Sequence, residues 1–196
     1  LLHGPGPGLV GALARLGPVM ADAKLHDIPT QVQAAARRLG EYGARWVTAH
    51  ASGGVEMLQA AGAGLAAGCG SREAGILAVT VLTSIDQPIL NEDLRVPGAL
   101  EAQVLHLAKR TEAARLDGIV CSATDLHALR GQLREGFLFV TPGIKGTTTP
   151  AGADQKRVLS PGGAVAAGSS LLVVGRAITD AADRRQAARE ILQDIA

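Results

Sequence analysis

Short apolar runs alternate along this chain with longer segments of helical period. Six runs are rich in residues that favour strands, and they predict strands at residues 19–23, 46–49, 76–82, 118–121, 137–141 and 171–174. Parallel strands need a crossover between them, which is usually a helix, so this alternation is typical of βα units. The pattern therefore predicts an α/β fold, either a barrel or a doubly wound sheet.

The segments between the runs carry apolar residues at spacings of three and four, as in helices that cover a sheet. These residues are Val32, Ala35, Ala36 and Leu39 in one segment, and Leu100, Val104 and Leu107 in another. A short helix is predicted over residues 9–16. Ser160-Pro161 has the pattern of a helix start, and we expect Thr179-Asp180 to open the final helix.

Composition excludes several classes of protein. Lys plus Arg total 19 against 18 for Asp plus Glu, so no field of one sign attracts nucleic acid or an anionic membrane. The apolar runs are far shorter than the roughly 20 residues that cross a bilayer. Cys69 and Cys121 stand far apart, which indicates neither a disulfide framework nor a metal site and suits a reducing compartment. We therefore expect a single-domain cytoplasmic protein of 196 residues that binds no metal.

Charged residues gather where the first predicted strand ends. Asp22 and Lys24 are two apart, so they point to the same side of an extended chain, and Asp27 follows just beyond. Two carboxylates can flank one ammonium there, which keeps the lysine protonated and makes it a candidate proton donor. The alternative is a surface salt bridge. We favour a functional site because a strand buried on both faces leaves few exposed places for three charges.

Polar residues also follow the next three predicted strands. His50 ends the second, where a histidine more often packs and hydrogen-bonds neighbouring loops than acts in catalysis. The hydroxyls of Thr83 and Ser84 can bond a polar ring or cap their own loop. Cys121 has no adjacent base, so we expect it to be inert packing.

The last two predicted strands lead into segments suited to an anion. A long loop rich in Gly, Thr and basic residues follows Thr141, as expected of a lid, with a merely mobile surface loop as the alternative. Gly175 allows close backbone approach, and Arg176 can contact a phosphate with two nitrogens or pair with Asp180 instead. In a (β/α)8 barrel the final two loops are the usual phosphate site.

Five segments together resemble the orotidine 5'-phosphate decarboxylase family of the bacterial type. They are DAKLHDIP at 22–29, HASGG at 50–54, PGIK at 142–145, DQKR at 154–157 and VGRAIT at 174–179. The resemblance runs from one end of the chain to the other. It implies a TIM (β/α)8 barrel, of which this chain holds about six of eight strands.

The activity that the resemblance implies is decarboxylation of orotidine 5'-monophosphate to UMP and CO2 in pyrimidine biosynthesis, with no metal or organic cofactor. Lys24 would stabilise the carbanion at C6 and then protonate it, and Asp22 would lie beside the departing carboxylate. Asp27 would reach into the partner's site in a homodimer. The resemblance also implies substrate contacts for Ile28, Gln31, Thr83, Ser84, Pro142, Lys145, Gln155, Gly175 and Arg176.

Three features depart from the family pattern. Thr30-Gln31 replaces the usual Asn-Thr, and Lys145 stands where Arg is common. The family's upstream Asp and second catalytic Lys have no counterpart in this chain. We therefore expect the chain to lack its first two strands, since a barrel of this type has roughly 230 to 250 residues.

Two alternatives stay open. A magnesium-dependent hexulose-phosphate synthase or ketogulonate-phosphate decarboxylase of the same superfamily uses a similar Asp-x-Lys-x-x-Asp set. A non-catalytic phosphate-binding remnant is the other.

Overall fold

The computed structural model describes residues 6, 8–144 and 159–196. The strands within these ranges are β1 (Met20–Leu25), β2 (Trp46–His50), β3 (Gly75–Val79), β4 (Gly118–Val120), β5 (Leu138–Thr141) and β6 (Leu171–Leu172). The α-helices are α1 (Gly8–Ala14), α2 (Pro29–Glu41), α3 (Gly54–Cys69), α4 (Leu100–Ala113), α5 (Leu126–Leu129), α6 (Pro161–Ala167), α7 (Arg176–Thr179) and α8 (Arg184–Asp194). Single turns of other helix types are η1 (Ala51–Gly53), η2 (Ile89–Asp93) and η3 (Ala123–Asp125). Each predicted strand is confirmed, with ends that move by at most three residues.

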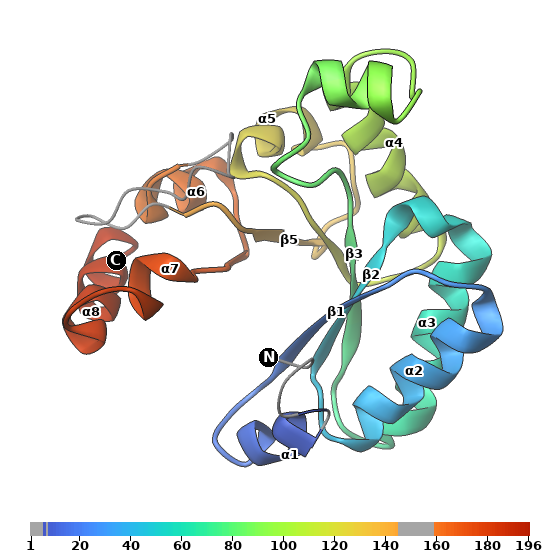
Figure 1. Ribbon diagram of the computed structural model, residues 1–196, viewed down its shortest axis with the longest axis horizontal. Coiled ribbons are helices and arrows are strands. Elements are labelled where there is room, and N and C mark those ends of the chain that lie inside the picture. Colours follow the sequence, from blue (N-terminus) through green and yellow to red (C-terminus); the bar gives the residue numbers. More distant parts are fainter. Residues whose placement is uncertain (1–5, 7, 145–158) are drawn as a thin grey trace. The chain divides into compact units, whose positions relative to one another are not determined.

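The chain forms two compact units. The first contains the described residues up to Thr80 together with Leu107–Ile119, and the second contains Val81–His106 and the described residues from Val120 onward. In the first unit β1, β2 and β3 are parallel neighbours, and α2 and α3 lie side by side along them (Figure 1). The Asp117 carboxylate accepts a hydrogen bond of 3.0 Å from the Ile76 amide, so it ties the start of β4 to β3.

Glycines allow α2 and α3 to pack with their backbones almost in contact. A Cβ on Gly64 would meet the carbonyl oxygen of Gln33, and one on Gly68 would meet that of Arg37. A Cβ on Gly40 would lie 3.0 Å from the Cys69 amide nitrogen. Any larger residue at these positions would therefore push the two helices apart.

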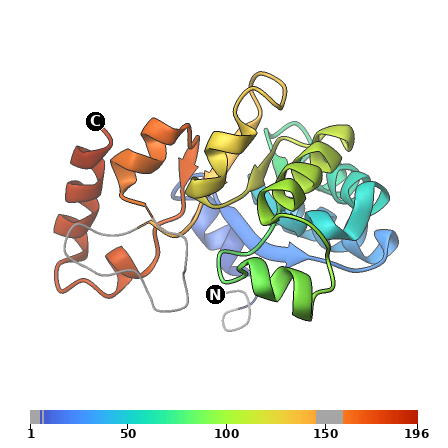
Figure 2. The same ribbon diagram turned by 90° about the horizontal axis from the view of Figure 1, so that it is seen from above.

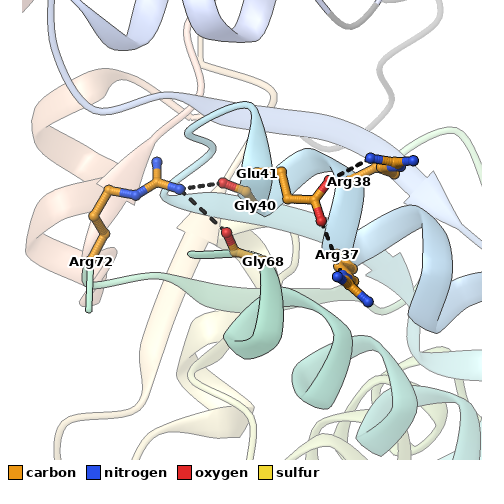
Figure 3. Close-up of polar contacts among 6 residues, drawn as sticks. All are labelled: Arg37, Arg38, Gly40, Glu41, Gly68 and Arg72. Atoms are coloured by element: carbon orange, nitrogen blue, oxygen red, sulfur yellow. Dashed lines mark hydrogen bonds and ion pairs between the residues drawn. The ribbon is translucent and has the colours of Figure 1, made fainter. Parts of the chain in front are cut away.

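Arg72 joins the carboxyl ends of the same two helices (Figure 3). Its Nη2 donates to the carbonyl of Gly40 at 2.6 Å and to that of Gly68 at 3.4 Å, and its Nε donates to the carbonyl of Cys69 at 3.1 Å. These carbonyls have no partner inside their own helices, and the helix dipoles place partial negative charge there. One guanidinium thus contacts both helix ends, in addition to the Gly43 and Arg72 amides, which donate to the Gly40 and Cys69 carbonyls.

The second unit is built on β5 and β6, which are parallel, with Thr141 opposite Leu172. The Cys121 amide, just after β4, donates to the Val140 carbonyl at 3.1 Å. Helices α6 and α8 lie beside each other (Figure 2), and the Gly162 amide donates to the Asp194 carboxylate at 2.8 Å. Ser160 caps α6 as predicted, because its hydroxyl accepts from the Gly163 amide.

Two expectations from the sequence are wrong. The final helix does not open at Thr179, which ends α7; Asp183 caps α8 by accepting from the Gln186 amide. Nor is β1 buried on both faces, since the side chains of Asp22 and Lys24 are 48% and 43% exposed. In the described part of the first unit β1 pairs with β2 along one edge, and its charged residues lie in contact with solvent.

Within the described ranges, no helix combines the length and the apolar character that a membrane crossing requires.

Gly68→Ala tests the close helix packing. The added methyl group would meet a backbone carbonyl, which cannot swing away as a flexible side chain can, so we expect the free energy of unfolding to fall by about 1–3 kcal/mol. Gly8→Ala in α1 is the control, because a Cβ there meets nothing within 4 Å. Chemical denaturation measures both variants. Equal stability of the two would contradict the packing described.

Candidate active site

A bulge in β1 shapes the cluster of charges at the carboxyl end of that strand. Ala21 pairs with Val47 and Leu25 pairs with Ala49, so three residues of β1 lie opposite the single residue Thr48. Within the bulge, Lys24 has a φ of 47°. This left-handed conformation costs a residue with a Cβ about 1–2 kcal/mol, and such bulges redirect side chains.

Asp22, Lys24 and Thr48 form a closed set of polar contacts. Lys24 Nζ lies 2.6 Å from Asp22 Oδ2, and the Thr48 hydroxyl donates to Asp22 Oδ1 at 2.9 Å. The same hydroxyl accepts from the Lys24 backbone amide at 2.9 Å. The predicted pairing of Asp22 with Lys24 is confirmed, and it forms within an irregular part of β1 rather than on a regularly paired strand.

Two histidine rings lie beside this pair. The ring centroids of His26 and His50 are 5.4 Å apart, with His50 at the end of β2. Burial lowers the pKa of His50 below its ordinary 6.5, and electrostatic interactions with His26 and Lys24 lower it further, although the Asp22 carboxylate acts in the opposite direction. His50 is therefore a neutral group that borders the ion pair at neutral pH.

Asp27 does not flank Lys24 in the described structure. Its Oδ1 instead accepts from the Ile28 amide at 2.6 Å, directly before α2. Ile28 is 61% exposed, and Gln31 in the first turn of α2 is also exposed. These three predicted residues thus form an exposed surface around the start of one helix.

The other described candidates belong to the second unit. Pro142 follows β5, while Gly175 and Arg176 precede and begin α7 after β6, so both groups lie at the carboxyl ends of parallel strands as predicted. Thr83 is half-buried and Ser84 is exposed, in the segment that leads to η2. Cys121 is buried, in agreement with the packing role expected of it. Lys145 and Gln155 lie outside the described residues.

Within residues 8–144 and 159–196, no three His, Cys, Asp or Glu side chains gather closely enough to hold a metal ion.

Thr48 is the residue of this cluster that the sequence analysis missed. It is 1% exposed, although it is polar and lies within a strand that is otherwise apolar at its centre. A buried hydroxyl needs hydrogen-bond partners. In the sequence, the feature that points to Thr48 is a lone threonine within an apolar strand, two residues before a candidate histidine.

Parallel strands with covering helices, and an acid–lysine pair at the carboxyl end of one strand, are features found in enzymes of the (β/α) barrel class. The family model described as "Orotidine 5'-phosphate decarboxylase / HUMPS family" matches residues 1–191. The chain belongs to this family.

Individual relatives agree with the family. The chain is 43% identical to an orotidine 5'-phosphate decarboxylase of Lactiplantibacillus plantarum, over 99% of this chain and 83% of the relative. It is 47% identical to one of Anaeromyxobacter sp. (strain K), over 97% and 82%. The crystal structure of orotidine 5'-phosphate decarboxylase from Lactobacillus acidophilus superposes with a TM-score of 0.86 at 34% identity, and covers 100% of this chain and 83% of that one. The predicted TIM-barrel class and family are confirmed.

The lowered pKa of His50 predicts how stability depends on pH. The unfolded chain takes up a proton near pH 6.5 while the folded protein does not, so the free energy of unfolding should fall as the pH drops below about 6.5. Denaturation between pH 5 and 8 measures this slope, and His50→Gln should flatten it. An NMR titration of the His50 ring with a midpoint at or above 6.5 would contradict the assignment.

Proposed function

We propose that this protein converts orotidine 5'-monophosphate to UMP and CO2 in the de novo synthesis of pyrimidines. Because the reaction releases CO2, the protein is a carboxy-lyase. The observation that carries the proposal is the Asp22–Lys24 ion pair of 2.6 Å at the end of β1, in a chain 43–47% identical to two orotidine 5'-phosphate decarboxylases over nearly its whole length.

The chemistry follows from the charge on Lys24. Loss of CO2 leaves an electron pair at C6 of the pyrimidine, and an adjacent ammonium stabilises this carbanion electrostatically. The same ammonium then transfers a proton to C6, which gives UMP and a neutral amine. Asp22 orients the ammonium through its 2.6 Å contact and lies beside the departing carboxylate. No step in this sequence uses a metal or an organic cofactor.

Binding of the nucleotide involves residues away from the reacting carbon. Gly175 and Arg176 bind the phosphate together with Lys145 and Gln155, since a guanidinium and nearby amides suit a dianion. Thr83, or Ser84 in its place, contacts the pyrimidine, and Pro142 takes part in substrate binding. Binding energy from the remote phosphate then contributes to the rate at C6.

The protein acts in the cytoplasm as a homodimer whose sites are shared. Asp27 reaches the partner's site across the interface, and Ile28 and Gln31, on the same exposed surface, contact the substrate. Their exposure at the start of α2 leaves these side chains accessible to a second copy of the chain.

Lys24→Ala tests the proposed proton donor. Removal of the ammonium should lower kcat by about 10²- to 10⁴-fold. Binding of UMP should still be measurable by calorimetry. Lys109→Ala, at an exposed position on α4, serves as the control and should keep the wild-type rate. Decarboxylation that persists in Lys24→Ala would refute the donor role.

The same assay with EDTA separates this reaction from that of magnesium-dependent relatives in the superfamily, which would lose activity on chelation. The decarboxylase proposed here keeps its rate.

Arg176→Ala tests the proposed phosphate contact. With orotidine 5'-monophosphate we expect kcat/KM to fall by about tenfold or more, because a charge-assisted contact is lost. With orotidine, which has no phosphate, the variant and the wild type should react alike. Arg185→Ala on α8 is a matched control for the loss of one exposed arginine. An unchanged kcat/KM would remove Arg176 from the phosphate site.

A further inference from the structure

We infer that Thr48 is a positioning residue, whose buried hydroxyl holds both Asp22 and Lys24 in the geometry that the reaction needs. The inference rests on the proposed function. It concerns a residue that touches neither the reacting carbon nor the phosphate in the mechanism above, and that acts through the two groups that do.

The first support is the register of β1 and β2. Thr48 is the single residue of β2 that lies between the pairs Ala21–Val47 and Ala49–Leu25, directly opposite the bulge. A bulge interrupts the ladder of backbone hydrogen bonds and leaves amides without strand partners. The Thr48 hydroxyl supplies the missing acceptor for one of them, the Lys24 amide, at 2.9 Å.

The second support is the direction of the hydrogen bonds. A backbone amide can only donate, so the Thr48 oxygen must accept from Lys24. The hydroxyl proton is then free to point at the Asp22 carboxylate, an acceptor when ionised, and the 2.9 Å contact to Oδ1 fits this direction. Asp22 keeps its second oxygen, Oδ2, for the Lys24 ammonium.

The third support is burial. Thr48 is 1% exposed, whereas the side chains of Asp22 and Lys24 are about half exposed. An exposed ion pair has many accessible geometries and little intrinsic stability. A hydroxyl fixed within the sheet removes part of that freedom at one carboxylate oxygen and at the lysine backbone, and thereby orients the ammonium before substrate binds.

The test compares Thr48→Val with Thr48→Ser in the natural protein. Valine keeps the shape of threonine and removes the hydroxyl, while serine keeps the hydroxyl. For Thr48→Val we expect kcat to fall by about tenfold or more, with KM and the UMP dissociation constant changed less than about twofold, because the phosphate contacts are intact. Thr48→Ser should stay within about threefold of the wild-type kcat.

Thr111→Val is the matched control for loss of a buried hydroxyl. Thr111 is also fully buried, and its hydroxyl donates to the Leu107 carbonyl at 2.9 Å, a contact that involves none of the charged residues Asp22, Lys24 and Asp27. We expect this variant to lose thermal stability and to keep the wild-type kcat. If Thr111→Val lowers kcat as much as Thr48→Val does, general destabilisation explains the effect and the inference is wrong.

Crystal structures of the wild type and of Thr48→Val provide a readout independent of activity. We expect the contact between Lys24 Nζ and Asp22 Oδ2 to be lost or rearranged in the variant. An unchanged pair, or an unchanged kcat in Thr48→Val, overturns the role of Thr48 alone. A wild-type protein that does not decarboxylate orotidine 5'-monophosphate would instead contradict the proposed function, and the comparison of crystal structures would still decide whether Thr48 holds the pair.

Discussion

The contact between Lys24 and Asp22 is made where β1 departs from regular strand geometry. If β1 were regular, one residue of β1 would face each residue of β2. The bulge instead places three residues opposite Thr48, and Lys24 adopts a left-handed conformation there. Such a conformation persists when its surroundings compensate for its cost, and the Thr48 hydroxyl does so by accepting the Lys24 amide. Conformational cost of this kind is concentrated at functional sites, where it positions reactive groups.

The surrounding scaffold gives these contacts a fixed frame. Helices α2 and α3 pack closely through their glycines. Arg72 also donates hydrogen bonds to carbonyls at the carboxyl ends of both helices, and these contacts hold the two helices together. The first of these helices begins at Pro29, two residues after Asp27, so its placement also sets the surface that we propose for the partner subunit. The packing of α2 on α3 is therefore linked to the Asp22–Lys24 pair through the short segment between β1 and α2.

Sequence reasoning predicted the elements that depend on local pattern. All six strands and the Ser160 cap follow from residues close together in the chain, as does the location of the charged cluster. The bulge and the role of Thr48 could not be predicted in this way, because they arise from pairing between strands about 25 residues apart in the chain. The start of α8 was misplaced since Thr179-Asp180 and Asp183 both suit a cap, and side-chain chemistry alone does not choose between them.

The central claim is that the Lys24 ammonium protonates C6 of the pyrimidine. The most direct measurement is a crystal structure of the natural protein with UMP bound. The account predicts that Lys24 Nζ lies within about 3.5 Å of C6, a distance that permits proton transfer, and that it keeps its contact with Asp22. An ammonium well away from that edge of the base, with UMP bound in the site, would contradict the account.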